Sequence, residues 1–381
     1  MIDYNARLGR LQTAMAEHGI ELTFISRSAD LSYIIGLIRE EPNFGNTMYP
    51  GEWLTGAWVP VSGKPILTVP QMVADFHAMD AGETEVRVLG KNDDGVAMAA
   101  SVLRDLKVSP NAHIAVEDRA WSETMLNLQK LRPQATFSLA SALIGPMRRI
   151  KDDVELTILR EAGVITELAY ADTLPLLKHG MTNLDIISEV RYQLRKHGAT
   201  ADSFVTACYN MGPNYPFDFS NRNEVLLLPV MPPISVSFDF GAVYKDYCYD
   251  WGRSIFFGEP DAEYRRVYDL VMASQAAGIA ALRVGNTCEA ADATARAVIE
   301  DAGYGYAFRH RLGHGIGMDV HETPFLLAGD DTVMEEGMCF TVEPSIFIPH
   351  VMGARVEDIV VVRPGGGEPL TSGYQSLLVV P

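Results

Sequence analysis

The feature that most restricts how this chain can fold is a set of acidic residues placed inside apolar, strand-like stretches of its second half. Asp239 lies within the run Ser-Val-Ser-Phe-Asp-Phe, Glu343 ends an apolar run, and Glu357 comes just before Ile-Val-Val-Val. An unpaired carboxylate is costly to bury in such surroundings. A fold that forms these strands must therefore supply them with opposite charge.

A fourth acid, Asp250, follows Asp239 by eleven residues. The intervening sequence predicts two antiparallel strands joined by a turn near residues 244–246. That spacing can bring both carboxylates to one face of the hairpin, close together. Two close carboxylates repel each other, so we expect a cation between them or a shared proton.

Histidines gather in a glycine-rich segment further along the chain. His310, His314 and His321 are three of the nine histidines, and the glycines around them allow a close backbone approach. A carboxylate-rich set with one imidazole suits Mn²⁺, Co²⁺ or Zn²⁺. Two divalent cations would balance four carboxylates and could hold a bridging hydroxide as nucleophile. Those four are Asp239, Asp250, Glu343 and Glu357.

The order of predicted elements divides the 381 residues into two domains, 1–150 and 151–381. Strands and helices alternate in the first, which predicts a small α/β domain. Long helices are expected over 152–177, 183–197, 262–282 and 289–302, with β-rich sequence after residue 200. The expected strands of the first domain are 22–26, 57–61, 65–69, 85–89, 113–117 and 136–139, and its clearest helices are 95–106 and 122–131.

Composition excludes several classes of partner. The formal net charge is −18 and the chain has no Lys/Arg run, which argues against nucleic acid and anionic membranes. No apolar run is long enough to span a bilayer, and the first residues do not form a secretory signal. The four cysteines are too few for a disulfide scaffold. These features predict a cytoplasmic protein with reduced thiols.

The ordered acids and histidine, taken together, resemble the pita-bread metallohydrolase family, which contains methionine aminopeptidase, aminopeptidase P, prolidase and the metal-free creatinase. The family's ligand order falls on Asp239, Asp250, His314, Glu343 and Glu357. The resemblance implies an α/β (α+β) protein. Its C-terminal catalytic domain would have the pita-bread fold, and its N-terminal domain would be like that of aminopeptidase P, prolidase and creatinase.

The resemblance also implies roles for individual residues. Asp250 and Glu357 would bridge two metals, Asp239 would chelate one of them, and His314 and Glu343 would complete the other. Glu343 would handle the proton in attack on an amide carbonyl, a general acid–base role. Two further histidines would contact substrate and stabilise the oxyanion, and an arginine would act behind the ligands or on a substrate carboxylate. These are His310, His321 and Arg355. The family further implies a homodimer.

Three departures from the family pattern concern the substrate. The family's peptidases usually carry a histidine upstream of the first metal aspartate, where this chain has the aromatics Phe217 and Phe219. We expect these two to bind substrate. Gly252 replaces a usual hydroxyl residue before Arg253. An insert at residues 40–53 either restricts access to a small substrate or is an ordinary surface loop.

Three functions remain open on the sequence. The first, which the ligands and histidines favour, is a dinuclear-metal Xaa-Pro aminopeptidase or dipeptidase, with manganese preferred over cobalt, zinc or iron. The second, which the aromatic substitution favours, is a small-molecule C–N hydrolase, creatinase- or ectoine-hydrolase-like, or a lyase on the same scaffold. The third, a binding module without activity, is opposed by the complete ligand set, because four clustered carboxylates without metal would be destabilising.

Overall fold

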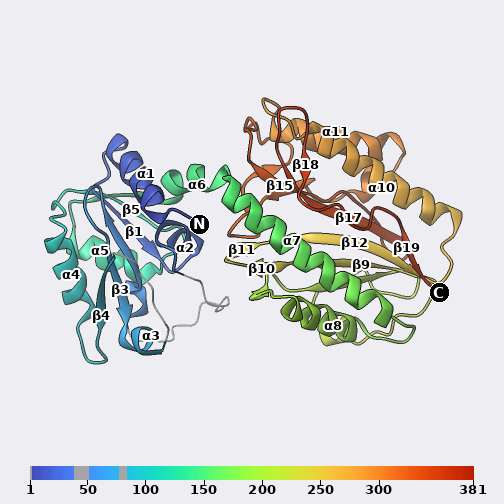
Figure 1. Ribbon diagram of the computed structural model, residues 1–381, viewed down its shortest axis with the longest axis horizontal. Helices are drawn as coiled ribbons and strands as arrows, with labels where there is room; N and C mark the ends of the chain where they lie inside the picture. Colours follow the sequence, from blue (N-terminus) through green and yellow to red (C-terminus); the bar gives the residue numbers. More distant parts are fainter. Residues whose placement is uncertain (1, 38–50, 77–83) are drawn as a thin grey trace. The chain divides into compact units, whose positions relative to one another are not determined.

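The computed structural model describes residues 2–37, 51–76 and 84–381. The chain divides into two compact units, Met1–Arg148 and Arg149–Pro381. Most of the insert expected at residues 40–53 lies outside the described residues. Each unit is described by itself below (Figure 1).

The first unit is built on a mixed six-stranded sheet with the order β4-β3-β2-β1-β5-β6. Strand β1 pairs antiparallel with β2 and parallel with β5. The strands are β1 (Leu22–Ser26), β2 (Gly56–Pro60), β3 (Ile66–Pro70), β4 (Glu85–Leu89), β5 (His113–Val116) and β6 (Thr136–Leu139). The helical elements are α1 (Tyr4–Glu17), α2 (Ala29–Ile35), η1 (Glu52–Leu54), α3 (Gln71–Phe76), α4 (Gly95–Asp105), α5 (Ser122–Leu131) and α6 (Ser141–Arg149).

The second unit is built on a ten-stranded sheet whose main path has the order β14-β13-β15-β17-β12-β9-β8, with β16 and β18 paired to β17 and β19 paired to β12. It also has a three-stranded sheet with the order β11-β10-β7. Its helical elements are α7 (Asp153–Thr173), η2 (Leu174–Leu176), α8 (Asn183–Lys196), α9 (Asn223–Leu226), α10 (Ala262–Ala281), α11 (Cys288–Asp301) and η3 (Gly305–Ala307). Its strands are β7 (Ala201–Asp202), β8 (Ala207–Met211), β9 (Ile234–Phe240), β10 (Ala242–Tyr244), β11 (Tyr247–Cys248), β12 (Trp251–Phe257), β13 (Gly313–Gly315), β14 (Glu322–Leu326), β15 (Cys339–Val342), β16 (Ser345–Ile348), β17 (Met352–Val361), β18 (Glu368–Pro369) and β19 (Leu378–Val380).

Helices cover one face of the large sheet. Side chains that do not point toward these helices lie on the opposite face. On β9, Phe238 and Phe240 pack against Tyr170 of α7. On β17, Asp358 accepts a hydrogen bond from Gln275 of α10. Side chains alternate along a strand, so the neighbours of these residues project to the face away from the helices.

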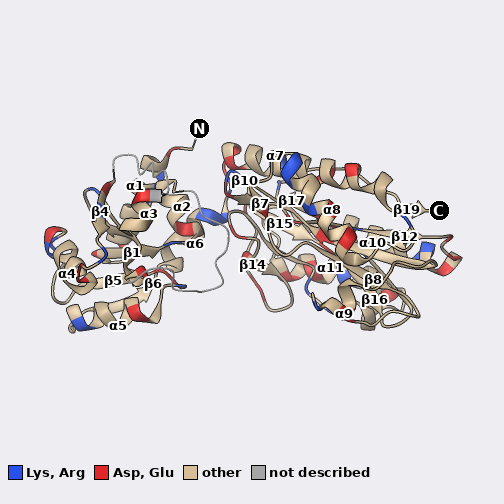
Figure 2. Cartoon of the chain, turned by 90° about the horizontal axis from the view of Figure 1, so that it is seen from below, with Lys and Arg blue, Asp and Glu red and all other residues tan. Residues whose placement is uncertain are grey.

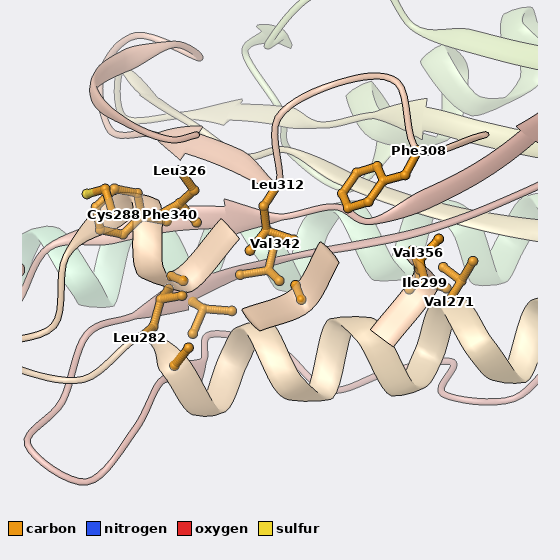
Figure 3. Packing of buried hydrophobic residues seen from close by; sticks show 14 of the residues in the cluster. Val271, Leu282, Cys288, Ile299, Phe308, Leu312, Leu326, Phe340, Val342 and Val356 are labelled. Carbon is orange, nitrogen blue, oxygen red and sulfur yellow. The ribbon is translucent and has the colours of Figure 1, made fainter. Parts of the chain in front are cut away.

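A hydrophobic core lies between the helix pair α10 and α11 and the sheet (Figure 3). Val271 of α10 and Ile299 of α11 pack there with Val342 and Val356 of the sheet, all fully buried. Leu312, just before β13, belongs to the same cluster. The core therefore anchors the start of the histidine segment.

The described charged residues do not gather on one part of either unit. Short basic and acidic stretches are interspersed in both units (Figure 2). Within the described ranges, no helix has both the length and the apolar character that crossing a membrane requires. All four cysteines are buried and unbridged.

Candidate metal centre

The hairpin predicted between Asp239 and Asp250 is confirmed. Tyr244 pairs with Tyr247 across a two-residue turn at Lys245 and Asp246, which both adopt positive φ. Further along the hairpin, β9 and β12 pair antiparallel, with Asp239 opposite Gly252. Asp250 lies two residues before Gly252, so the two acids are diagonal neighbours on the same face.

Gly252 lies on the central strand of the site, between two of its acids. It pairs with Asp239 on one side and with Glu357 of β17 on the other. A Cβ atom at this position would lie 2.9 Å from the carbonyl oxygen of Phe238 and 3.2 Å from Oε2 of Glu357. The glycine therefore leaves room between two carboxylates that face each other across the central strand.

His314 is oriented by the glycines on either side of it. A Cβ on Gly313 would lie 1.9 Å from the Thr341 carbonyl oxygen, and one on Gly315 would lie 2.6 Å from that of Glu322. The ring's Nδ1 donates to the Gly315 carbonyl at 3.0 Å. This bond fixes the tautomer in which Nε2 is the open nitrogen.

Nε2 of His314 points into the acidic cluster, 3.5 Å from Oδ2 of Asp250 and 3.5 Å from Oε1 of Glu343. Arg355 lies among the remaining carboxylates. Its guanidinium is 2.5 Å from Asp239 Oδ2, 3.5 Å from Glu357 Oε2 and 3.8 Å from Glu343 Oε2. The structure thus brings together all five predicted ligands and Arg355.

The donor atoms fit divalent cations. Ligand atoms of Asp250, His314 and Glu357 all lie within 4.8 Å of one another, and all three residues are buried. Asp250 Oδ1 and Glu357 Oε2 are buried without a hydrogen bond. Four carboxylates around one arginine leave excess negative charge, and hard or borderline divalent ions prefer such oxygen-rich sites with an imidazole.

The titration of these groups reflects the same crowding. Burial raises the pKa of Asp239 and of Glu357, and raises that of Glu343 to about 7. Burial opposes the charged form of His314, but the carboxylates of Asp250 and Glu343 beside its Nε2 leave its pKa raised. Each shift favours protonation, which reduces the negative charge of the metal-free cluster. A bound cation would balance that charge instead and would lower the pKa of the carboxylates.

The two other histidines of the segment have different environments. His310 Nδ1 donates to the Arg311 carbonyl at 2.7 Å, and its Nε2 is 2.6 Å from Ser345 Oγ. His321 packs edge-on against His314, with ring centroids 4.1 Å apart, and forms no ring hydrogen bond within the described part of the chain. Burial lowers the pKa of both histidines to about 4, so both rings are neutral at pH 7.

Phe217 and Phe219 join an aromatic wall that reaches the histidine segment. Phe219 packs edge-on against Phe217 at 5.0 Å and lies 5.5 Å from Phe347, whose ring is 6.2 Å from that of His310. Tyr209 extends this wall on β8. Because Ala207 pairs with Asp239, Tyr209 lies on the same face of the sheet as that acid. The wall therefore borders the acidic cluster.

Sequence reasoning assigned no role to two arginines that hold the site in place. Arg253 is buried and Arg296 is partly buried. Arg253 donates to the Glu357 carbonyl at 2.8 Å and forms a two-bond pair with Asp358. Arg296 pairs with Asp292 along α11 and donates to the His310 carbonyl at 2.8 Å. Only the Asp292/Arg296 spacing of four, typical of helical ion pairs, was a local signal. The Arg253–Asp358 pair joins strands 105 residues apart.

Comparison with known proteins agrees with this geometry. Residues 157–364 match the model of metallopeptidase family M24, and residues 7–150 match that of the creatinase/prolidase N-terminal domain. The chain is 32% identical to an Xaa-Pro dipeptidase of Lactobacillus delbrueckii subsp. lactis, over 98% of this chain and 99% of that protein.

Solved structures are similar over nearly the whole chain. A dipeptidase from Pyrococcus horikoshii OT3 superimposes with a TM-score of 0.87 at 27% identity, covering 98% of this chain and 100% of that one. An Xaa-Pro dipeptidase from Bacillus anthracis gives 0.84 at 28% identity, covering 99% and 100%. The chain belongs to metallopeptidase family M24. It is a metal-dependent hydrolase with the pita-bread fold, as its sequence predicted.

Proposed function

We propose that this protein is an Xaa-Pro dipeptidase that works with two divalent metal ions. The observation that carries the proposal is the buried cluster of Asp250, His314 and Glu357, completed by Asp239 and Glu343, in a chain similar over its full length to an Xaa-Pro dipeptidase. Four carboxylates would balance two divalent ions, and manganese suits the oxygen-rich set best.

Each residue would have a defined task. Asp250 and Glu357 would bridge the ions, Asp239 would chelate one, and His314 with Glu343 would bind the other. When bound, such ions polarise a carbonyl and lower the pKa of a water. Glu343 would accept a proton from the attacking water and return it to the leaving proline nitrogen, a general acid–base role.

The groups around the ligands would position and stabilise the substrate. His321, neutral and with open ring nitrogens, would donate to the developing oxyanion. His310 would contact the substrate beside Phe347, once the Ser345 hydroxyl rotates away from its Nε2. Phe217 and Phe219 would contact the apolar part of the substrate. Arg355 would hold the carboxylates in their array.

We further propose that the protein acts in the cytoplasm and as a homodimer. The four buried, unbridged cysteines support a reducing compartment. The dimer rests on the family resemblance.

The test is a metal analysis combined with a substrate panel on Mn²⁺-loaded protein. The panel holds Xaa-Pro dipeptides, Xaa-Pro-Xaa tripeptides, and N-acyl and guanidino compounds including creatine. We expect two ions per chain and turnover of the dipeptides, with Asp250→Ala as the inactive control. Turnover of tripeptides alone would contradict the dipeptidase assignment and indicate an aminopeptidase.

The aromatic wall favours a second candidate, a small-molecule C–N hydrolase or lyase. Two ions per chain with no peptide turnover, and turnover of a guanidino or N-acyl compound, would establish it. If the missing upstream histidine limits peptide cleavage, Phe217→His or Phe219→His should raise a weak dipeptidase activity. No gain at either position would discard that explanation.

A further inference from the structure

A dipeptide differs from a longer peptide by carrying a free carboxylate one residue beyond the scissile bond. One residue spans about 3.3–3.6 Å of extended chain. An enzyme selective for dipeptides therefore needs a cation just outside its catalytic cluster. Arg355 is poorly placed for this, because its guanidinium is already surrounded by three carboxylates of the cluster.

Arg311 lies beside the catalytic cluster without a carboxylate partner. Its guanidinium lies over the ring of Phe325 at 5.0 Å. Phe325 pairs with His314 across β13 and β14, so the two side chains share a face of the sheet. Among the described residues no acid pairs with Arg311, and its Nε is buried without a hydrogen bond.

Arg311 lies beside the histidines that flank the site. It directly follows His310 in the chain, and the ring that its guanidinium covers, Phe325, lies opposite His314. His314 in turn packs against His321. An unpaired guanidinium in a half-buried setting recognises a carboxylate well, because it presents a planar fork of donors.

The backbone around Arg311 is held rigidly, so its side chain starts from a fixed point. Leu312 is buried in the core beneath the sheet (Figure 3), and its backbone N–H donates to Asp292 Oδ1 at 2.8 Å. The Arg311 carbonyl accepts from His310, and the His310 carbonyl accepts from Arg296. Such fixing reduces the entropy lost when a ligand binds.

We propose that Arg311, stacked on Phe325 beside His314 and His321, binds the C-terminal carboxylate of a dipeptide substrate and so makes the enzyme selective for dipeptides. This rests on the proposed dipeptidase function and adds to it the residue that reads substrate length.

Arg309 offers a matched control. It is two residues away, is exposed, and also lies over an aromatic ring, that of Phe217 at 5.4 Å. A general loss of positive charge near the site would therefore affect Arg309→Gln and Arg311→Gln alike. A specific carboxylate site would affect only the second.

The experiment measures binding to the Mn²⁺-loaded protein, so that it does not depend on turnover. The probes are a reduced-bond analogue of Ala-Pro, in which a methylene replaces the scissile carbonyl, and the C-terminal amide of that analogue. We expect wild type and Arg309→Gln to bind the free acid roughly 10- to 100-fold more tightly than the amide. Arg311→Gln should bring this ratio to about one by weakening the acid alone, and Arg311→Lys should restore part of it.

Equal affinity of wild type for acid and amide would overturn the proposal, even if Arg311→Gln does not fold. So would a ratio that survives in Arg311→Gln or disappears in Arg309→Gln. Hydrolysis of Ala-Pro and Ala-Pro-amide by wild type separates the two levels of inference. If Ala-Pro is cleaved but acid and amide bind equally, only the role of Arg311 is wrong. If neither is cleaved nor bound, the dipeptidase function fails as well.

Discussion

Glu357 and Asp358 are neighbours on β17, yet the sheet places them in opposite electrostatic environments. On the helix-covered face, Asp358 accepts hydrogen bonds from Arg253 at 2.8 and 3.0 Å and from Gln275 at 2.9 Å. On the other face, Glu357 shares Arg355 with Asp239 and Glu343. Its buried Oε2 accepts no hydrogen bond.

The difference separates a structural ion pair from a binding site. Asp358 is matched by one cation and fully hydrogen-bonded, so it has nothing further to bind. Glu357 belongs to an excess of negative charge that only an added cation or proton can relieve. Breaking a matched buried pair leaves a buried charge alone, whereas removing one of several like charges reduces repulsion. The two acids should therefore respond to mutation in opposite ways.

The largest effect is expected from Glu357→Gln. Turnover should fall below detection and the metal content should drop, because a carboxylate that we propose bridges the ions is lost. The free energy of unfolding of the chelator-treated protein should stay the same or rise, because repulsion is reduced. Metal analysis and urea denaturation measure the two effects. A variant that keeps two ions per chain would disprove the bridging assignment.

Asp358→Ala should instead destabilise the fold, by about 3–5 kcal/mol, because Arg253 is left buried and unpaired. Urea denaturation of the metal-free protein measures this loss. The control is Glu368→Ala, which breaks partly exposed pairs with Arg160 and Arg363, each worth less than about 1 kcal/mol. Equal losses in the two variants would contradict the distinction between the faces.

Sequence patterns predicted most elements of the first unit because those signals are local. Strands β1, β4 and β6 and helix α5 have the predicted bounds. Helix α6 was missed because Pro146 lies inside it, and proline normally interrupts a helix. Helix α2 was missed because its seven residues are too few to show a helical period.

The site divides in the same way. Acids within apolar strands and glycines around His314 can be recognised in the sequence, because each is an unusual residue within one short segment. The place of Gly252 between Asp239 and Glu357 depends on strand register across the sheet. Whether Arg311 lacks a carboxylate partner depends on which acids the fold places near it. Neither property follows from any one segment.

Of the two histidines that we propose contact the substrate, His321→Ala should lower kcat/KM more than His310→Ala. Removing one oxyanion donor costs roughly 100- to 1,000-fold, and His321 is the ring with open nitrogens. His310 already bonds to Ser345 and the Arg311 backbone, so we expect a smaller loss, with metal content intact in both variants. Loss of metal in His310→Ala would show that this ring supports the ligands instead.

The first unit shows a third way to bury a carboxylate. Glu117 of the first unit is buried near Asp30, and Asp30 pairs with Arg148 at 2.6 Å. Ser28 is the hydrogen-bond donor to Glu117, at 3.1 Å. Burial, and then the charge of Asp30, raise the pKa of Glu117 to about 8. A bound proton neutralises Glu117. Arg253 neutralises Asp358 in the same way, and a bound metal would neutralise Glu357.

The smallest effect is the pH dependence that follows from this proton. Between the ordinary pKa of a glutamate and about 8, the folded chain holds one proton more than the unfolded chain at Glu117, so the free energy of unfolding should fall as pH rises. The slope would be about 1.4 kcal/mol per pH unit. Glu117→Gln should remove this contribution and gain stability over wild type above pH 8, while Glu123→Gln, at an exposed glutamate of the same unit, should keep it. Urea denaturation at pH 6 and pH 8.5 measures the slope. If Glu117→Gln and wild type respond alike, Glu117 is ionised in the folded chain and Arg148 serves both acids.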